Sequence, residues 1–277
     1  MLHAETVLQS ATTLLRQSSD SARLDAELLL SHVLQCPRSA FYRNDPIAEH
    51  ALGPFYALLE RRAQGEPIAY LIGHQEFYED RFRVNPAVLI PRPETETLIQ
   101  QVVNTPSHPT NAFLDLGCGS GCVGLSLAKL YPHAQVDLVD LSPEALDVAK
   151  LNAKELKLSN VRFFESAWFN DLPTPSRYDW IVSNPPYLMD NDPRAEQAVL
   201  AYEPTLALVS GADGLNAIRD IIQNASAHLN RPGQLWLEHG VDQASSVRQL
   251  LLSQGFSEVA SVRDLAGIER ISGGVLR

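Results

Sequence analysis

The sequence predicts an α/β fold, in which helices cover both faces of a mostly parallel β-sheet, preceded by a small N-terminal helical bundle. Two observations indicate this fold. From residue 112 onward, short runs of β-branched and aromatic residues alternate with stretches of helical periodicity, an order typical of parallel strands joined by crossover helices. Before residue 75, leucine and valine recur at helical spacing without such alternation.

Residues 1–75 are therefore expected to form a helical domain. Residues 76–93 are expected to link it to the rest of the chain, with one strand at 77–84 and a proline-stiffened loop at 85–93. A helix should begin at Glu94, and residues 94–277 should form the larger domain. The apolar positions of the bundle include Val7, Leu14, Leu15, Leu24, Leu28, Leu29, Val33, Leu34, Leu52, Leu58 and Leu59.

The larger domain shows strand-like and helix-like segments in alternation. Strands are predicted at 112–116, 135–140, 161–165, 178–183, 256–262 and 270–276. Helices are predicted near 94–103, 122–131, 143–156, 213–229 and 241–254. Sequential strands separated by helices must cross over the sheet, so both of its faces are expected to be covered.

A glycine-rich loop follows the strand at 112–116. It consists of Gly117, Cys118, Gly119, Ser120 and Gly121. Glycines let a backbone approach a ligand closely and turn sharply into a helix. A dinucleotide fingerprint needs a third small residue where Cys122 stands, and no P-loop lysine follows. The loop therefore favours S-adenosylmethionine, which has no pyrophosphate; the alternative is a glycine-rich turn without a ligand.

Two further residues are candidates for the same ligand. Asp140 ends the second strand, 25 residues after Asp115, and an acid at such a position can accept hydrogen bonds from both ribose hydroxyls. Ser142, followed by Pro143, is a better helix N-cap than Asp140, which leaves the Asp140 carboxylate available. Trp168 follows the third strand and is a candidate to cover the adenine, with core packing as the alternative.

The candidate catalytic residues follow the strand at 178–183, where the chain continues as Asn184, Pro185, Pro186 and Tyr187. Proline cannot donate to a sheet ladder and biases the residue before it away from helix. The Asn184 oxygen and the Pro185 carbonyl are thus expected to accept the two hydrogens of a planar NH2 group, with Tyr187 against its flat face. A plain surface turn is the alternative.

Composition narrows the class of protein. The chain has 277 residues, 45% of them hydrophobic, enough for a full core. Cys36, Cys118 and Cys122 make neither a disulfide framework nor a C-x-x-C zinc pair, so no metal is expected. The N-terminus has no signal-peptide pattern, and a cytoplasmic protein is expected. A net charge of -11 argues against extensive, sequence-independent binding to the phosphate backbone of nucleic acid.

With these motifs the chain resembles the peptide chain release factor glutamine methyltransferases of the HemK/PrmC family, class I S-adenosylmethionine-dependent enzymes. N-P-P-Y also occurs in adenine methyltransferases, so its combination with the other motifs carries the resemblance. The further matching segments are Gly73-His74-Gln75-Glu76-Phe77-Tyr78, Ile90-Pro91-Arg92-Pro93-Glu94-Thr95-Glu96, Glu203-Pro204 with Ala207-Leu208, and Arg263-Asp264-Leu265 with Gly267 and Arg270.

The resemblance implies a Rossmann-like seven-stranded sheet and methylation of the glutamine in the Gly-Gly-Gln motif of a release factor, a step linked to translation termination. It places the cofactor on Gly117 to Gly121, Asp140, Trp168 and Asn184, and the substrate glutamine on Asn184 to Tyr187, with Asn184, Pro185 and Tyr187 catalytic. Ala167 departs from the family, which often has Asp there, so the adenine would lack one hydrogen bond.

The resemblance further implies a release factor as the partner, with no direct nucleic-acid or membrane contact and a monomeric protein. Two other functions stay open. An enzyme that methylates the amino group of a flipped base would meet the same planar NH2 group, although the acidic charge weighs against it. A binding protein that kept the fold and lost the chemistry is the third possibility, and Ala167 alone favours it.

Overall fold

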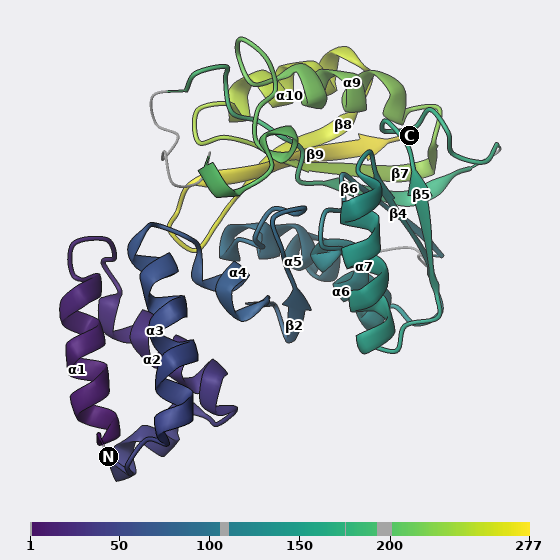
Figure 1. Ribbon diagram of the computed structural model, residues 1–277. Coiled ribbons are helices and arrows are strands. Elements are labelled where there is room, and N and C mark those ends of the chain that lie inside the picture. Colours follow the sequence, from purple (N-terminus) through teal and green to yellow (C-terminus); the bar gives the residue numbers. More distant parts are fainter. Residues whose placement is uncertain (1, 106–110, 175, 193–200) are drawn as a thin grey trace. The chain divides into compact units, whose positions relative to one another are not determined.

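The computed structural model describes residues 2–105, 111–174, 176–192 and 201–277. It divides into two compact units, Met1–His74 and Gln75–Arg277 (Figure 1). Each unit has a hydrophobic core of its own. Within the described residues, no helix combines the length and the apolar character needed to cross a membrane.

The first unit is helical, as predicted. It contains α1 (Ala4–Leu15), α2 (Ala22–Leu34), the 3-10 helix η1 (Arg38–Arg43), α3 (Glu49–Ala63) and α4 (Ile68–Ile72). Val7, Leu15, Leu29 and Leu59 are buried between the helices with Phe55 of α3, whereas Leu14 and Leu24, also expected in the apolar pattern, are exposed. Asp25 of α2 is also buried and accepts a hydrogen bond of 2.7 Å from Arg62 of α3. This ion pair satisfies a carboxylate that would otherwise be costly to bury.

The second unit confirms the predicted seven-stranded, mostly parallel sheet. Its strand order is β5-β4-β3-β6-β7-β9-β8, and only β9 runs antiparallel to its neighbours. The strands are β3 (Ala112–Leu116), β4 (Gln135–Asp140), β5 (Val161–Glu165), β6 (Tyr178–Ser183), β7 (Leu229–Glu238), β8 (Ser257–Arg263) and β9 (Glu269–Leu276). The chain leaves β3 toward β4 on one side and later returns to β6 on the other, which makes the β3–β6 boundary a topological switch point.

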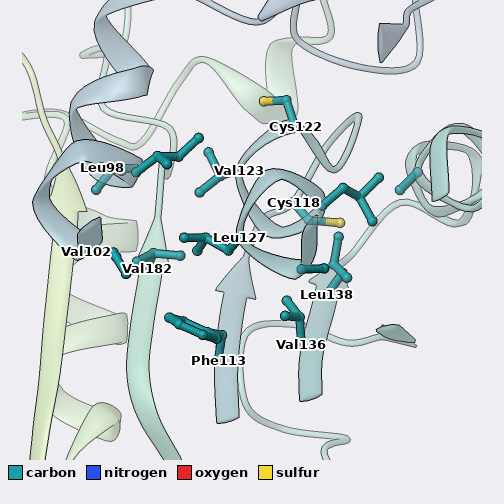
Figure 2. Packing of buried hydrophobic residues seen from close by; sticks show 14 of the residues in the cluster. Leu98, Val102, Phe113, Cys118, Cys122, Val123, Leu127, Val136, Leu138 and Val182 are labelled. Atoms are coloured by element: carbon teal, nitrogen blue, oxygen red, sulfur yellow. The ribbon is translucent and has the colours of Figure 1, made fainter. Parts of the chain in front are cut away.

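Helices cover both faces of this sheet (Figure 1). One face packs against α5 (Glu96–Asn104), α6 (Cys122–Leu130) and α7 (Pro143–Glu155), and the other against α9 (Asn216–Ala225) and α10 (Ala244–Ser253). Neighbouring residues of a strand point to opposite faces, so Phe113 packs under α6 and Leu114 on the side of α9. Figure 2 shows Phe113, Val136 and Val182 of three strands beneath Leu127 of α6.

Some predicted elements differ from the structure. The strand β7 was not predicted, and the helix expected to begin at Glu94 begins at Glu96. The strand expected at 77–84 is a hairpin of β1 (His74–Phe77) and β2 (Asp80–Arg83), because Tyr78 adopts a positive φ of 56° and donates its backbone N–H to Glu96 instead of to a strand. The helix expected to reach residue 229 ends at Ala225, since Leu229 pairs with Tyr178 as the start of β7.

The residues expected to link the domains are packed into the second unit. Phe77 and Phe82, from the two strands of the hairpin, are buried in the same core cluster as α5 and α6. Their rings meet edge to face with centroids 6.0 Å apart. The short 3-10 helix η2 (Pro93–Thr95) then leads directly into α5, and a second one, η3 (Thr205–Ala207), precedes α9.

Candidate active site

Four parallel strands end side by side, and their ends bring the sequence motifs together. Leu116, the last residue of β3, pairs with Val139 of β4 and with Ser183 of β6. The Ser183 hydroxyl donates to the Leu116 carbonyl over 2.6 Å, and the Cys118 backbone N–H donates to the Val139 carbonyl over 2.9 Å. The glycine loop, Asp140 and Asn184 therefore meet at the carboxyl edge of the sheet, where α/β folds bind ligands.

A cavity of about 660 Å³ opens at this edge. Such a volume is in the usual range for a small-molecule site. The predicted residues that line it are Gly117, Cys118, Gly119, Ser120, Asp140, Trp168, Asn184 and Pro186. Three predicted residues do not line it, namely Gly121, Pro185 and Tyr187. Gly121 instead caps the start of α6 with a φ of 81°, a conformation that disfavours other residues.

Gly117 and Trp168 form one wall of the cavity. Gly117 has a φ of 67°, and a Cβ atom placed on it would lie 3.4 Å from Cζ3 of the Trp168 ring. Trp168 itself has a φ of 54°, which is rare for a bulky residue and is maintained only where surrounding structure enforces it. The Ser166 hydroxyl accepts the Asp171 backbone N–H over 3.0 Å and so closes the turn that carries the indole.

Asp140 faces the glycine loop. One carboxylate oxygen accepts the Gly119 backbone N–H over 2.8 Å, and the other accepts the Ser142 N–H over 2.9 Å. Burial raises the pKa of Asp140, and these two backbone hydrogen bonds oppose the shift. A carboxylate offers about four acceptor positions, so each oxygen can still accept a hydrogen bond from a ligand hydroxyl in the cavity.

Asn184 is held by a residue that sequence reasoning did not place in the site. Its side-chain nitrogen donates to the Thr95 hydroxyl oxygen over 3.2 Å. Thr95 is buried and lines the cavity. Tyr187 is not among the residues that line the cavity, and its hydroxyl donates over 3.3 Å to Glu238, the buried last residue of β7.

Sequence reasoning also missed residues that reach the cavity from distant parts of the chain, among them Val88, Pro91, Asp115, Ser166 and Leu206. Asp115 is buried, and its Oδ2 accepts the Gly124 backbone N–H over 2.8 Å. Burial raises its pKa to about 7, with the charge of Asp140 adding to the shift. A carboxyl near the end of a buried strand, two residues before Gly117 of the glycine loop, was the one available signal for Asp115.

Two distant motifs meet beside the cavity. Glu203 is buried, accepts the Ile90 backbone N–H over 3.0 Å and forms a salt bridge with Arg92. The ion pair joins the I-P-R-P-E-T-E segment to the Glu203-Pro204 segment, both of which contribute lining residues. Within the described part of the chain, no cluster of three or more histidine, cysteine or acidic residues is arranged to hold a metal ion.

The sequence matches two families. Residues 93–203 match the family described as "Methyltransferase small domain", and residues 6–73 match the "PrmC N-terminal domain". The fold and the cavity at its switch point are those of a class I methyltransferase. Solved structures agree on the fold: a methyltransferase from Pyrococcus furiosus (TM-score 0.52, 18% identity, 70% of this chain and 87% of that one) and the hMettl16 catalytic domain (TM-score 0.56, 17% identity, 69% and 73%).

Relatives that match nearly the full length of the chain narrow the class of methyltransferase. Proteins named release factor glutamine methyltransferase are similar to this chain in Vibrio cholerae (41% identity, 97% of this chain and 95% of the relative). The same holds in Burkholderia pseudomallei (44%, 96% and 96%) and Coxiella burnetii (40%, 98% and 98%). The chain belongs to the release factor glutamine methyltransferase family, which confirms the resemblance, and it is an S-adenosyl-L-methionine-dependent methyltransferase.

Proposed function

We propose that this protein methylates the side-chain amide nitrogen of the glutamine in the Gly-Gly-Gln motif of a peptide chain release factor. The observation that carries the proposal is the orientation of Asn184. Its nitrogen donates to Thr95, so its oxygen is available as an acceptor at the cavity wall. An amide NH2 has two hydrogens to donate. The Asn184 oxygen is assigned to accept one, and the Pro185 carbonyl is proposed to accept the other, although Pro185 itself does not line the cavity.

The cavity residues fit the cofactor in three respects. The glycine loop leaves open space beside Gly119, where an added Cβ would meet no atom within 4 Å. Asp140 has acceptor capacity for a ribose diol, as argued above. The Trp168 indole offers a flat apolar surface for an adenine. We assign Gly117 to Ser120, Asp140 and Trp168 to cofactor binding, with Gly121 supporting the loop as the cap of α6.

The bound cofactor supplies an electrophilic methyl group on a sulfonium. The amide nitrogen of glutamine is a weak nucleophile because its lone pair is delocalised into the carbonyl. Acceptors on both of its hydrogens direct that lone pair at the methyl group and hold it there. The hydrogens become acidic as the nitrogen gains positive charge, so Asn184 and the Pro185 carbonyl stabilise the transition state more than the ground state. No strong base is needed before attack.

The helical unit is proposed to recognise the protein substrate. It folds around its own core and leaves Tyr42 92% exposed beside Arg38. Aromatic and arginine side chains are enriched at protein interfaces. We propose residues 1–75 as the recognition domain, 76–93 as the connection and 94–277 as the catalytic domain. The protein is further proposed to act as a monomer in the cytoplasm, without direct contact to nucleic acid.

The test offers labelled S-adenosyl-L-methionine together with a release factor, ribosomal proteins and nucleic acid in separate reactions. Peptide mass spectrometry then locates the label. We expect it on the glutamine of the Gly-Gly-Gln loop alone. Label on adenine or guanine, with the release factor unmodified, would instead establish the alternative of a base methyltransferase, which shares the N-P-P-Y motif.

A further inference from the structure

Glu203 is a buried carboxylate that connects two segments of the cavity wall and that the proposed reaction does not use. Its Oε2 accepts the Ile90 backbone N–H over 3.0 Å, and its Oε1 accepts a hydrogen from the Arg92 guanidinium. The Glu203 side chain is 2% exposed, and that of Arg92 is 34% exposed. A carboxylate is costly to bury even when it is paired, so an ion pair at this place calls for a functional explanation.

On one side, the ion pair is connected to the first residue of the N-P-P-Y segment. Arg92 directly precedes η2, and its carbonyl accepts the Thr95 backbone N–H over 3.1 Å. The Thr95 hydroxyl oxygen accepts the Asn184 side-chain N–H over 3.2 Å. Two hydrogen bonds through a single residue therefore connect Arg92 to Asn184.

On the other side, the ion pair is connected to the end of the same segment. Glu203 lies two residues before η3, and the chain continues from η3 to Leu208. The Leu208 carbonyl accepts the Leu188 N–H over 2.9 Å, and the Leu188 carbonyl accepts the Ser210 N–H over 2.8 Å. Leu188 directly follows Tyr187, so residues 203–210 are fixed to the end of N-P-P-Y.

Three segments thus form a closed frame, namely residues 90–95, 184–188 and 203–210. The first contacts the second through Thr95 and Asn184, the second contacts the third through Leu188, and Glu203 connects the third to the first. The residues of the frame that line the cavity are Pro91, Thr95, Asn184, Pro186, Pro204, Leu206, Ala207, Val209 and Ser210. The glycine loop, Asp140 and Trp168 are not part of the frame, so it borders the part of the cavity that contains Asn184.

We propose that Glu203 is a positioning residue that closes this frame and thereby fixes Asn184, through Arg92 and Thr95, relative to the wall formed by residues 204–207. The consequence for turnover rests on the proposed function, because it requires the Asn184 oxygen to meet the substrate amide in one geometry. Closure of the frame itself does not depend on which substrate is methylated.

Single-turnover methyl transfer to a release-factor fragment at saturating cofactor tests each contact. Glu203→Ala removes both contacts and should lower the rate constant roughly 10- to 100-fold, in line with the cost of a misplaced reacting group. Glu203→Gln should lose less, because its oxygen can still accept the Ile90 N–H. Arg92→Met should match Glu203→Gln, and Arg92→Lys, which keeps the charge, should restore most of the rate. The double variant Glu203→Gln/Arg92→Met should lose no more than either single variant, since both changes break the same ion pair.

A matched ion pair separates positioning from a merely structural role. Asp137 is fully buried and pairs with the half-exposed Arg162, and neither residue lines the cavity. Arg162→Met should lower the melting temperature about as much as Arg92→Met does, yet it should methylate at the wild-type rate. The dissociation constant of the cofactor should stay within about threefold of wild type in every variant, so that the loss lies in the methyl-transfer step. Equal rate losses in Arg162→Met and Arg92→Met would show that the role of Glu203 is structural only.

Nuclear magnetic resonance of the Asn184 side-chain NH2 gives a readout that needs no substrate. We expect slow hydrogen exchange in the wild type, Arg92→Lys and Arg162→Met, and faster exchange in Glu203→Ala and Arg92→Met. The two Arg92 variants keep the comparison decisive if Glu203→Ala does not fold. Unchanged exchange in Arg92→Met, or a wild-type rate of methyl transfer in that variant, would overturn the positioning role. If the exchange pattern is as expected and no release factor is methylated even by the wild type, the proposed substrate is wrong and the closure of the frame by Glu203 stands.

Discussion

The Trp168 indole lies against the Cα of Gly117, so that a methyl group added to Gly117 would come within 3.4 Å of the ring. The two residues follow different strands, β5 and β3, which lie on either side of β4 in the sheet. The contact couples the glycine loop to the proposed adenine surface. A change in either residue should therefore affect the affinity for the cofactor.

Trp168→Ala should weaken binding of S-adenosyl-L-methionine by roughly 1 to 3 kcal/mol, because the stacking surface is removed. Gly117→Ala should weaken it too, through its φ of 67° and its approach to the ring. Ala167→Asp should be tolerated and should tighten binding, since Ala167 lines the cavity and a carboxylate there can accept from the adenine amino group. Isothermal titration calorimetry measures all three; normal binding by Trp168→Ala together with lost binding by Ala167→Asp would mean that the adenine lies elsewhere.

Asp140→Ala should also reduce cofactor affinity by roughly 1 to 3 kcal/mol, the cost of leaving buried polar groups unpaired. The fold should survive, because the Gly119 and Ser142 N–H groups at the cavity can donate to water instead. Asp147→Ala is the control, an exposed carboxylate on α7. An unchanged dissociation constant in folded Asp140→Ala would remove Asp140 from the site.

Asn184→Ala should lower the turnover number by roughly two to three orders of magnitude, by analogy with the loss of one aimed transition-state hydrogen bond. Asn184→Gln should fail as well, because its longer side chain shifts the amide by about 1 Å from its place against Thr95. Cofactor affinity should change much less in both. Single-turnover kinetics and calorimetry on the same preparations check this, and near wild-type rates in both variants would contradict the mechanism.

The free energy of unfolding should fall as the pH rises from about 4.5 to 7. Burial raises the pKa of Asp115 and of Glu238 to about 7, so the native state holds protons that the unfolded chain has already released. Each such group costs about 1.4 kcal/mol per pH unit in that window. Glu238→Gln removes one titrating group and should flatten the dependence relative to wild type. Urea unfolding at several pH values measures it, and parallel curves for the two proteins would show that Glu238 titrates normally.

Much of the fold follows from local patterns in the sequence. The strands at 112–116, 135–140, 161–165 and 178–183 lie where the apolar runs predict them. The hairpin at Tyr78 was not predictable, because the carboxylate of Glu96 that receives its N–H lies 18 residues further along the chain. The end of the helix before β7 was missed for a similar reason, since the pairing of Leu229 with Tyr178 crosses about fifty residues.

Some residues of the candidate site could likewise be predicted from the sequence, and others could not. Four residues of the site stand at the ends of strands or in the glycine loop, namely Gly117, Asp140, Trp168 and Asn184. Because parallel strands end at a common edge of the sheet, the sequence alone places these residues at that edge. No local sequence pattern places Thr95 or Glu238 near the site. Thr95 lies between two glutamates at the start of a helix, and Glu238 resembles any polar residue that ends a strand.

By itself, the sequence determined the class of fold, the residues available for the cofactor and the catalytic segment, because these depend on periodicity and on residue types at short spacing. The tertiary structure alone decided that Thr95 accepts a hydrogen bond from Asn184 and that Glu238 accepts one from Tyr187. The physical reason is that hydrogen-bond direction depends on partners brought together by strand order, and strand order is a long-range property of the packed sheet.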